Sequence, residues 1–180
     1  MTLNILFALI LLLFLFAFAI LFLILEIYVV IIGHLKGAPV VPSNRRKIKT
    51  MIDAAKIREG ERAVDLGSGD GSVVLAAARR GACATGIEIN PFLVLYSRWR
   101  IKRAGLQTNA LIIKGDFWAY PLSDTDILFL YLLPKTLQKL EKKFMQELKP
   151  SARIISNDFQ IAGWTPIEVR DKVYLYKNKI

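Results

Sequence analysis

The residues with the clearest potential for chemistry are acids that lie at the ends of three successive apolar segments. Asp65 and Asp70 flank a glycine-rich turn, Val-Asp-Leu-Gly-Ser-Gly-Asp-Gly over residues 64–71, while Glu88 ends the next segment and Asp116 follows the third. A glycine-rich turn between a strand and a helix lets a ligand approach the backbone amides. Carboxylates beside such amides would repel a pyrophosphate, so the turn favours a ligand that carries positive charge.

S-adenosylmethionine (SAM) is a ligand of this kind, because it carries an amino group and a sulfonium. Glu88 stands where an acid in doubly wound folds accepts both ribose hydroxyls, and Asp116 with Phe117 suits adenine through a hydrogen bond and stacking. A dinucleotide is disfavoured because Ser72 occupies the position of the third glycine in that fingerprint. The predicted SAM-binding residues are Asp65, Gly67, Ser68, Gly69, Asp70, Gly71, Glu88, Asn90, Asp116 and Phe117.

Alternating strands and helices must position these residues. The apolar patterns and turn residues predict strands over 62–66, 83–89, 110–113, 127–131, 152–156, 165–170 and 172–176, and helices over 43–57, 71–80, 90–104 and 135–148. This alternation predicts an α/β, Rossmann-like fold with a mostly parallel sheet and helices on both faces. The last two strands predict an antiparallel edge hairpin around Asp171. We interpret Tyr96 and Trp99 as packing residues of the helix over 90–104.

The motifs together resemble those of class I, seven-stranded SAM-dependent methyltransferases. A closer resemblance is to the lysine methyltransferases that act on the ATP synthase c subunit and the adenine nucleotide translocase, with their prokaryotic relatives. The motifs are Gly-Ala-Pro-Val-Val-Pro-Ser over residues 37–43, the turn 64–71, Glu88 to Pro91, Tyr96-Ser97-Arg98, Asp116-Phe117-Trp118 and Trp164-Thr165-Pro166. Val40 departs from the family pattern, where we expect an aromatic residue. The resemblance implies SAM-dependent N-methylation of a lysine in a membrane-associated protein.

The expected chemistry is an in-line displacement at the methyl carbon, for which the protein positions the reactants and keeps the lysine neutral. Tyr131 follows the fourth strand, and it is our candidate catalytic residue, orienting the amine. The stretch 39–43 is either a cover over the cofactor or a linker. One cysteine and one histidine leave too few ligands for a zinc cluster, so we expect no metal.

The N-terminal segment differs from the rest of the chain. Residues 1–33 contain no Lys or Arg, and 5–25 form an unbroken apolar run, long enough to span a hydrocarbon core of about 30 Å. We therefore expect a transmembrane anchor over 1–33, a linker over 34–43 and the methyltransferase domain over 44–180. Basic residues follow the anchor, so the positive-inside rule predicts a single-pass protein with its N-terminus outside and its catalytic domain cytoplasmic. In a eukaryote we expect a mitochondrial membrane.

Two other function classes fit parts of the sequence. Residues 34–180 hold all 25 basic residues and all but one of the 15 acids, a net charge of +11. That charge would suit an RNA methyltransferase, and the anchor would suit one that acts on a lipid or hydrophobic small molecule. We expect a lipid bilayer rather than a nucleic acid as partner, because no RNA-binding module is appended. A non-catalytic SAM-binding membrane module is the other alternative.

Overall fold

The computed structural model describes residues 2–35 and 44–178. It divides the chain into two compact units, 1–39 and 40–180, which are treated separately below. The expectations for the motif 37–43, including Val40 and the cover formed by 39–43, lie outside the described residues. The first unit holds α1 (Thr2–Leu35), and by length and hydropathy its segment Ile5–Leu25 is a candidate membrane span.

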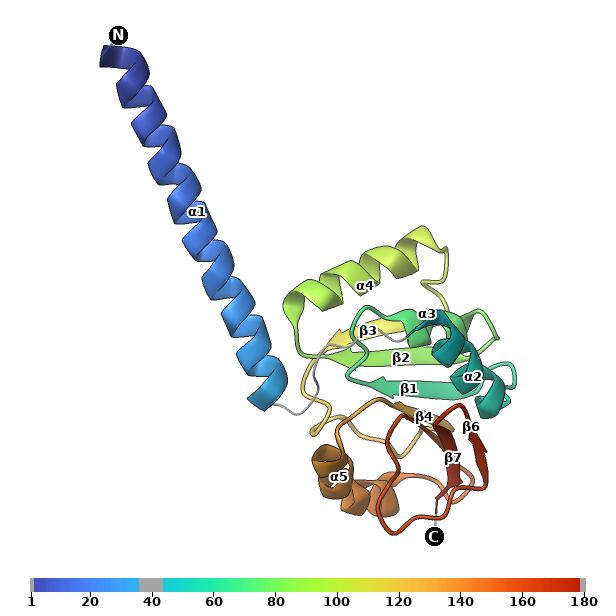
Figure 1. The fold of residues 1–180 in the computed structure, drawn as a ribbon. Coiled ribbons are helices and arrows are strands. Elements are labelled where there is room, and N and C mark those ends of the chain that lie inside the picture. Colours follow the sequence, from blue (N-terminus) through green and yellow to red (C-terminus); the bar gives the residue numbers. More distant parts are fainter. Residues whose placement is uncertain (1, 36–43, 179–180) are drawn as a thin grey trace. The chain divides into compact units, whose positions relative to one another are not determined.

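The second unit is a seven-stranded mixed sheet with helices packed on it (Figure 1). Its elements in chain order are α2 (Arg45–Ala55), β1 (Arg62–Leu66), α3 (Ser72–Ala78), β2 (Cys83–Glu88), α4 (Pro91–Arg103), β3 (Ala110–Lys114), β4 (Ile127–Leu130), α5 (Pro134–Glu147), β5 (Arg153–Asn157), β6 (Glu168–Arg170) and β7 (Val173–Lys177). The strand order is β3-β2-β1-β4-β5-β7-β6. Every predicted strand and helix of this unit is present, with ends that differ by a few residues.

Strands β1 to β5 are parallel, whereas β7 runs antiparallel to β5 and pairs with β6 as an edge hairpin. The hairpin turns at Asp171 and Lys172, which both have positive φ. Two successive residues with positive φ are typical of the tight turns that match the twist of a hairpin. The prediction of an antiparallel pair joined around Asp171 is therefore confirmed.

Helix α2 begins later than the sequence predicts. Its N-cap is Asn44, whose side chain accepts a hydrogen bond from the Arg46 amide over 3.0 Å, and Ser43 lies outside the described residues. The helix ends at Ala55 because Lys56 adopts the left-handed conformation. The expected boundary at residue 57 is therefore too late.

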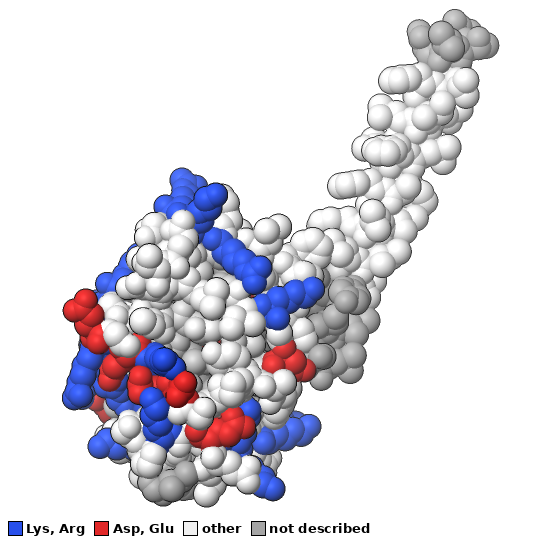
Figure 2. All heavy atoms as spheres, turned by 180° about the vertical axis from the view of Figure 1, so that it is seen from behind, with Lys and Arg blue, Asp and Glu red and all other residues white. Residues whose placement is uncertain are grey.

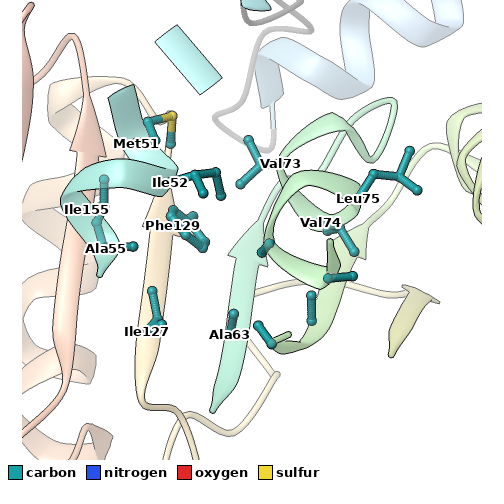
Figure 3. Packing of buried hydrophobic residues seen from close by; sticks show 14 of the residues in the cluster. Met51, Ile52, Ala55, Ala63, Val73, Val74, Leu75, Ile127, Phe129 and Ile155 are labelled. Atoms are coloured by element: carbon teal, nitrogen blue, oxygen red, sulfur yellow. The ribbon is translucent and has the colours of Figure 1, made fainter. Parts of the chain in front are cut away.

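Buried apolar residues lie on both faces of the sheet. Successive residues of β4 point to opposite faces, so this strand contributes to both. Ile127 and Phe129 pack with residues of α2 and α3 in one apolar cluster (Figure 3). Leu128 and Leu130 point to the opposite face and are fully buried as well, as are Leu137, Leu140 and Phe144 of α5. Because successive strand residues face opposite sides, α5 covers the face that α2 and α3 leave.

The parallel register brings the ends of five strands to one edge of the sheet. Leu66 pairs with Ile87 and with Leu130, Glu88 pairs with Lys114, and Leu130 pairs with Ser156. The residues that follow each strand therefore lie along one line. In an open α/β sheet this carboxyl edge is where ligands bind.

Candidate functional site

The glycine turn after β1 is fixed to the neighbouring strand β2. The amides of Gly67 and Ser68 both donate to the carbonyl of Ile87, over 2.9 and 3.0 Å. Gly67 and Gly69 have positive φ, which only glycine adopts without strain. The turn therefore has a defined position above the sheet before any ligand binds.

Gly86 in the middle of β2 makes room for this turn. A Cβ atom at Gly86 would lie 2.5 Å from Ser68 Oγ, 2.6 Å from Ser68 Cβ and 2.7 Å from Ile112 Cδ1. These distances are far below van der Waals contact, so any larger residue at Gly86 would displace the turn. A glycine outside the obvious motif thus belongs to the site.

Glu88 at the end of β2 is buried and connects two parts of the site. Its Oε2 accepts from the Gly69 amide over 2.9 Å, and its Oε1 accepts from the Asn90 amide over 2.8 Å. A carboxylate has about four lone-pair positions, so both oxygens can also accept from ligand hydroxyls. Asn90 in turn caps α4 by accepting from the Phe92 amide over 2.9 Å.

Asp65 is a buried carboxyl group inside β1. Burial raises its pKa to about 7, and the nearby negative charges of Glu88 and Asp70 act in the same direction. A group with this pKa changes its charge near neutral pH, and a cation beside it would favour the ionised form. A positively charged ligand beside Asp65 would therefore lower its pKa and release a proton near neutral pH.

Asp70 is held by protein groups. Its Oδ2 lies 2.5 Å from Arg100 Nη1, and its two oxygens accept from the amide and the hydroxyl of Ser72 over 3.0 and 2.7 Å. Much of its negative charge is thus balanced by Arg100 from α4. Its predicted contact with the cofactor stays a prediction, and in the structure Asp70 orders the start of α3.

The loop after β3 carries the expected acid and aromatic residues. The Trp118 amide donates to Asp116 Oδ1 over 3.1 Å, and the rings of Phe117 and Trp118 are tilted, with centroids 5.3 Å apart. Phe117 is buried and Trp118 is the exposed ring. The loop therefore presents Trp118 at its surface, while Phe117 supports it from inside.

Tyr131, directly after β4, belongs to a group that the sequence did not predict. Its hydroxyl bonds to Asp158, and Asp158 Oδ1 lies 2.6 Å from Lys47 Nζ of α2. Burial and then the bond to Asp158 raise the pKa of Tyr131 above 10. The ring of Tyr131 is stacked with Phe159 at a centroid distance of 6.4 Å.

The pKa of Asp158 is shifted downward, in contrast to that of Tyr131. Burial alone would raise its pKa, but hydrogen bonds from Lys47 and Tyr131 hold the pKa below the ordinary 3.8. Lys47 also donates to the carbonyl of Asp171, so it is fixed at two points. Tyr131 is therefore a neutral phenol, and Asp158 is a carboxylate whose charge Lys47 compensates.

Two buried side-chain atoms in the described part of the chain have no hydrogen-bond partner, Ser68 Oγ and Asn157 Oδ1. Both lie at the carboxyl edge, the first after β1 and the second at the end of β5. A buried polar atom without a partner is costly. Ser68 Oγ faces Gly86 of β2. The acids at this edge, Asp65 and Glu88, fit a cationic ligand that carries hydroxyl groups, such as SAM.

Sequence reasoning missed Asn157, Asp158 and Phe159, although a signal was present. They directly follow a predicted strand, which is the rule that identified Glu88 and Asp116. Lys47 and Arg100 carried no such signal, because their partners lie 111 and 30 residues away. No cluster that could hold a metal ion occurs among residues 2–35 and 44–178.

Comparison with known proteins gives a family match. The model of the ANTKMT methyltransferase domain matches residues 65–168. The chain is 37% identical to the human lysine N-methyltransferase of the ATP synthase c subunit over 142 residues, covering 77% of this chain and 60% of that protein. It is 31% identical over 155 residues to a protein-lysine N-methyltransferase of Saccharolobus islandicus, covering 81% of this chain and 96% of that protein.

A solved structure is similar over most of the second unit. It is described as an RNA methyltransferase from Salinibacter ruber in complex with S-adenosylhomocysteine, with 35% identity and a TM-score of 0.74. The match covers 76% of this chain and 93% of that one. The match shows that the fold is that of a SAM-dependent methyltransferase.

Proposed function

Because the chain belongs to the family of ANTKMT methyltransferase domains, we propose that it is a SAM-dependent methyltransferase acting on a lysine of a membrane-associated protein. The family assignment rests on the match over residues 65–168 and on the archaeal relative that the chain covers almost completely. The observation that carries the proposal is the shared sheet edge, where the acids Asp65 and Glu88 lie beside the pair Tyr131 and Asp158.

On the cofactor side, Glu88 would accept from the ribose hydroxyls and the turn at Gly67 to Gly71 would face the amino-acid part. Asp65 would balance its positive charge. The loop at Asp116 to Trp118 would hold adenine. When bound, SAM supplies an electrophilic methyl group whose bond to sulfur breaks as a bond to the lysine nitrogen forms.

On the acceptor side, Tyr131 would orient the amine. Because its hydroxyl hydrogen is donated to Asp158, the phenol oxygen has lone pairs left to accept an N–H from lysine. A lysine with a pKa of about 10.4 must lose a proton before it attacks. The aromatic walls of Tyr131 and Phe159 would favour the neutral amine by desolvation.

Lys47 has a part in this arrangement. An uncompensated carboxylate at Asp158 would stabilise the charged form of the incoming lysine and oppose its deprotonation. With Lys47 Nζ 2.6 Å from Asp158 Oδ1, that negative charge is balanced inside the protein. The pair can then fix Tyr131 without holding the substrate as an unreactive ammonium.

The proposed location follows from α1. A helix whose segment Ile5–Leu25 is apolar throughout suits a single membrane span, and the basic residues after it would keep the catalytic domain on the cytoplasmic side. In a eukaryotic cell the membrane would be mitochondrial. A tethered enzyme meets membrane substrates at high effective concentration. By their names, the relatives act on the ATP synthase c subunit and on the adenine nucleotide translocase.

RNA methylation is the second candidate, because the similar structure from Salinibacter ruber is described as an RNA methyltransferase. The basic surface of the domain would suit it. Both candidates use the same cofactor site, so they differ only in the acceptor.

The test is to incubate the full chain in membranes with methyl-labelled SAM and to separate protein, lipid and RNA. We expect label in protein alone. Label found only in RNA or only in lipid would show that this class of molecule, and not a protein lysine, is the methyl acceptor. Binding of SAM with no transfer to any fraction would leave a non-catalytic SAM-binding module.

A further inference from the structure

Helix α4 presents an apolar stripe to its surroundings. Phe92, Leu95, Tyr96 and Trp99 are spaced as neighbours on one helix face, and their exposed fractions are 53%, 71%, 49% and 51%. Tyr96 and Trp99 therefore pack on each other at the surface and not on the sheet, because Val94, Ser97 and Ile101 make the buried face of α4. A contiguous exposed apolar patch of this kind marks a surface suited to a protein or a membrane.

The stripe lies among basic residues. Helix α4 contains no acid. Three of the nearby arginines are bound within the domain: Arg100 to Asp70, Arg98 to the Ile112 carbonyl and Arg80, after α3, to Asp53. The charge beside the stripe therefore comes from Lys102 and Arg103 of α4 and from Arg79. In Figure 2 the upper edge of the domain, where α4 runs, carries blue basic side chains, while the red acidic ones gather lower. This face therefore suits an anionic partner.

The aromatic and basic groups are also joined to one another. The guanidinium of Arg103 lies 5.3 Å from the centre of the Trp99 ring, and Tyr96 is stacked on Trp99 with centroids 5.8 Å apart. A groove of about 460 Å³ between α3 and α4 is lined by Arg79, Tyr96, Trp99 and Arg103, among others. Its open, cationic walls suit a phosphate-bearing group with an apolar part.

We propose that this surface, the α4 face (Phe92, Leu95, Tyr96, Trp99 and Arg103), lies in the interface of a bilayer that contains anionic lipid. Tryptophan and tyrosine prefer the headgroup level of membranes, where an apolar ring and a polar edge are both accommodated. Phe92 and Leu95 reach the acyl boundary, as apolar residues of interfacial helices do. Arg103, with Arg79 on the other side of the groove, binds lipid phosphates.

A lipid surface explains the α4 face better than RNA does. RNA would use the basic groups and stacked rings, but it has no need of Leu95, which is the most exposed apolar residue of the stripe. The candidate span in α1 also ends close by in the chain. Arg45 follows Leu35 by ten positions, so a fully extended connection reaches about 35 Å.

Docking in this way has a consequence for the substrate. Phe92 is two residues beyond Asn90, which is bonded to Glu88 at the cofactor edge. A domain that lies on the bilayer through α4 keeps this edge near the membrane surface. A lysine just outside the hydrocarbon core is then within reach, whereas one far from the membrane is not. This inference rests on the proposed anchoring by α1.

The experiment uses the full chain with Cys83→Ser and one new cysteine, either Leu95→Cys on the α4 face or Val169→Cys on β6. Each cysteine is labelled with an environment-sensitive fluorophore, and each chain is reconstituted in vesicles of phosphatidylcholine with or without phosphatidylglycerol. We expect the Leu95 label, and not the Val169 label, to shift to the blue and to be quenched by nitroxide lipids when the anionic lipid is present.

Charge variants give a matched control. Lys102→Gln with Arg103→Gln should lower the ratio of docked to undocked domain by about fivefold for each charge removed. Lys139→Gln with Lys142→Gln removes the same charge from α5 and should leave the Leu95 signal unchanged. Equal loss with both pairs overturns the assignment to α4.

Vesicle flotation of the same samples reports the anchoring by α1 separately. A chain that floats while the Leu95 label stays as open to aqueous iodide as the Val169 label overturns the α4 proposal and retains the anchor. A Leu95 signal that responds to an RNA oligonucleotide and not to anionic vesicles assigns the face to RNA, which also overturns it.

Discussion

The amide of Gly69 donates a hydrogen bond to Glu88 Oε2 over 2.9 Å, which joins the glycine turn after β1 to the acid that ends β2. The two residues are 19 positions apart, and each is a predicted contact of the cofactor. One bond therefore sets the distance between the groups that would hold the amino-acid part and the ribose of SAM. The turn and the acid are thus held in place within the protein.

Replacing Glu88 by Gln should weaken SAM binding strongly. Hydrogen bonds to a charged acceptor are worth about 1.5–3 kcal/mol, which corresponds to roughly 10- to 100-fold in the dissociation constant. Calorimetric titration of the full chain with SAM measures this. Glu59→Gln removes the same charge at an exposed position and should bind as the wild type. Unchanged affinity in Glu88→Gln would falsify its role.

Replacing Gly86 by Ala should disturb the turn without touching the ligand. The new Cβ would lie 2.5 Å from Ser68 Oγ, so the turn must shift, and overpacking of this kind costs about 1–3 kcal/mol of unfolding free energy. Gly115→Ala is the control for stability, because its Cβ meets nothing nearer than 3.9 Å. Equal melting temperatures for the two variants would contradict the packing described for Ser68.

The affinity for SAM should depend on pH through Asp65. With a pKa of about 7 in the free protein, Asp65 is mostly protonated below that pH, and its ionised form binds the cation. The dissociation constant should therefore rise by up to about tenfold for each pH unit below 7. Titrations in buffers of different ionisation enthalpy should show proton release near pH 7, and Asp65→Asn should abolish it.

The ionisation of Asp65 should affect folding stability in the opposite direction to SAM affinity: stability should fall as the pH rises. Its folded pKa of about 7 exceeds the ordinary 3.8, so between these values the folded state binds more protons than the unfolded state. The free energy of unfolding should therefore fall as the pH rises through this window. Above pH 7 the full loss of stability is reached. In the absence of SAM, Asp65→Asn should raise the melting temperature at pH 8 more than at pH 5. A lower melting temperature for Asp65→Asn at pH 8 would contradict a carboxylate that is destabilised by burial.

Tyr131→Phe should separate catalysis from cofactor binding. It removes the phenol oxygen that would accept from the lysine but keeps the ring that stacks with Phe159. We expect kcat to fall by about 100- to 1,000-fold, as for the loss of one positioned hydrogen-bonding group, with SAM affinity unchanged. An unaltered kcat would show that Tyr131 only packs at the end of β4.

Lys47→Met should shift the pH profile of the reaction. Without Lys47 the carboxylate of Asp158 is uncompensated and stabilises the protonated form of the substrate lysine. The pH at which kcat reaches half its maximum should therefore move upward, because kcat reports ionisations in the enzyme–substrate complex. Lys49→Met is the matched control, since Lys49 pairs with Asp53 on the same helix, 2.7 Å away. A shift of equal size in both variants would remove the special role of Lys47.

The sequence predicted the fold well because its signals were local. Each feature could be predicted from neighbouring residues alone: the turn from the glycines at 67, 69 and 71, the start of a helix from Asn90, and a buried strand from the apolar run 127–130. The acids at strand ends were found by the same means, since parallel strands bring their carboxyl ends together. The strand order beyond the edge hairpin required the structure.

Relations between distant residues and between faces could not be predicted from the sequence. Arg100 balances Asp70 from another helix, and Lys47 reaches Asp158 across 111 positions. Tyr96 and Trp99 have the composition of a core stripe, and only the packing of α4 through Ser97 and Ile101 shows that they face outward. The spacing of aromatic residues shows that they share one face of a helix, but it does not show whether that face points to the core or to the outside.

The most direct test of the proposed activity is to locate the methyl group. The full chain in membranes is supplied with SAM carrying a trideuterated methyl group, and the membrane proteins are then digested and sequenced by mass spectrometry. We predict trideuteromethyl groups on lysine side-chain nitrogens, present with the wild type and strongly reduced with Glu88→Gln. Labelled RNA or lipid with no labelled lysine, from a chain that binds SAM normally, would contradict it.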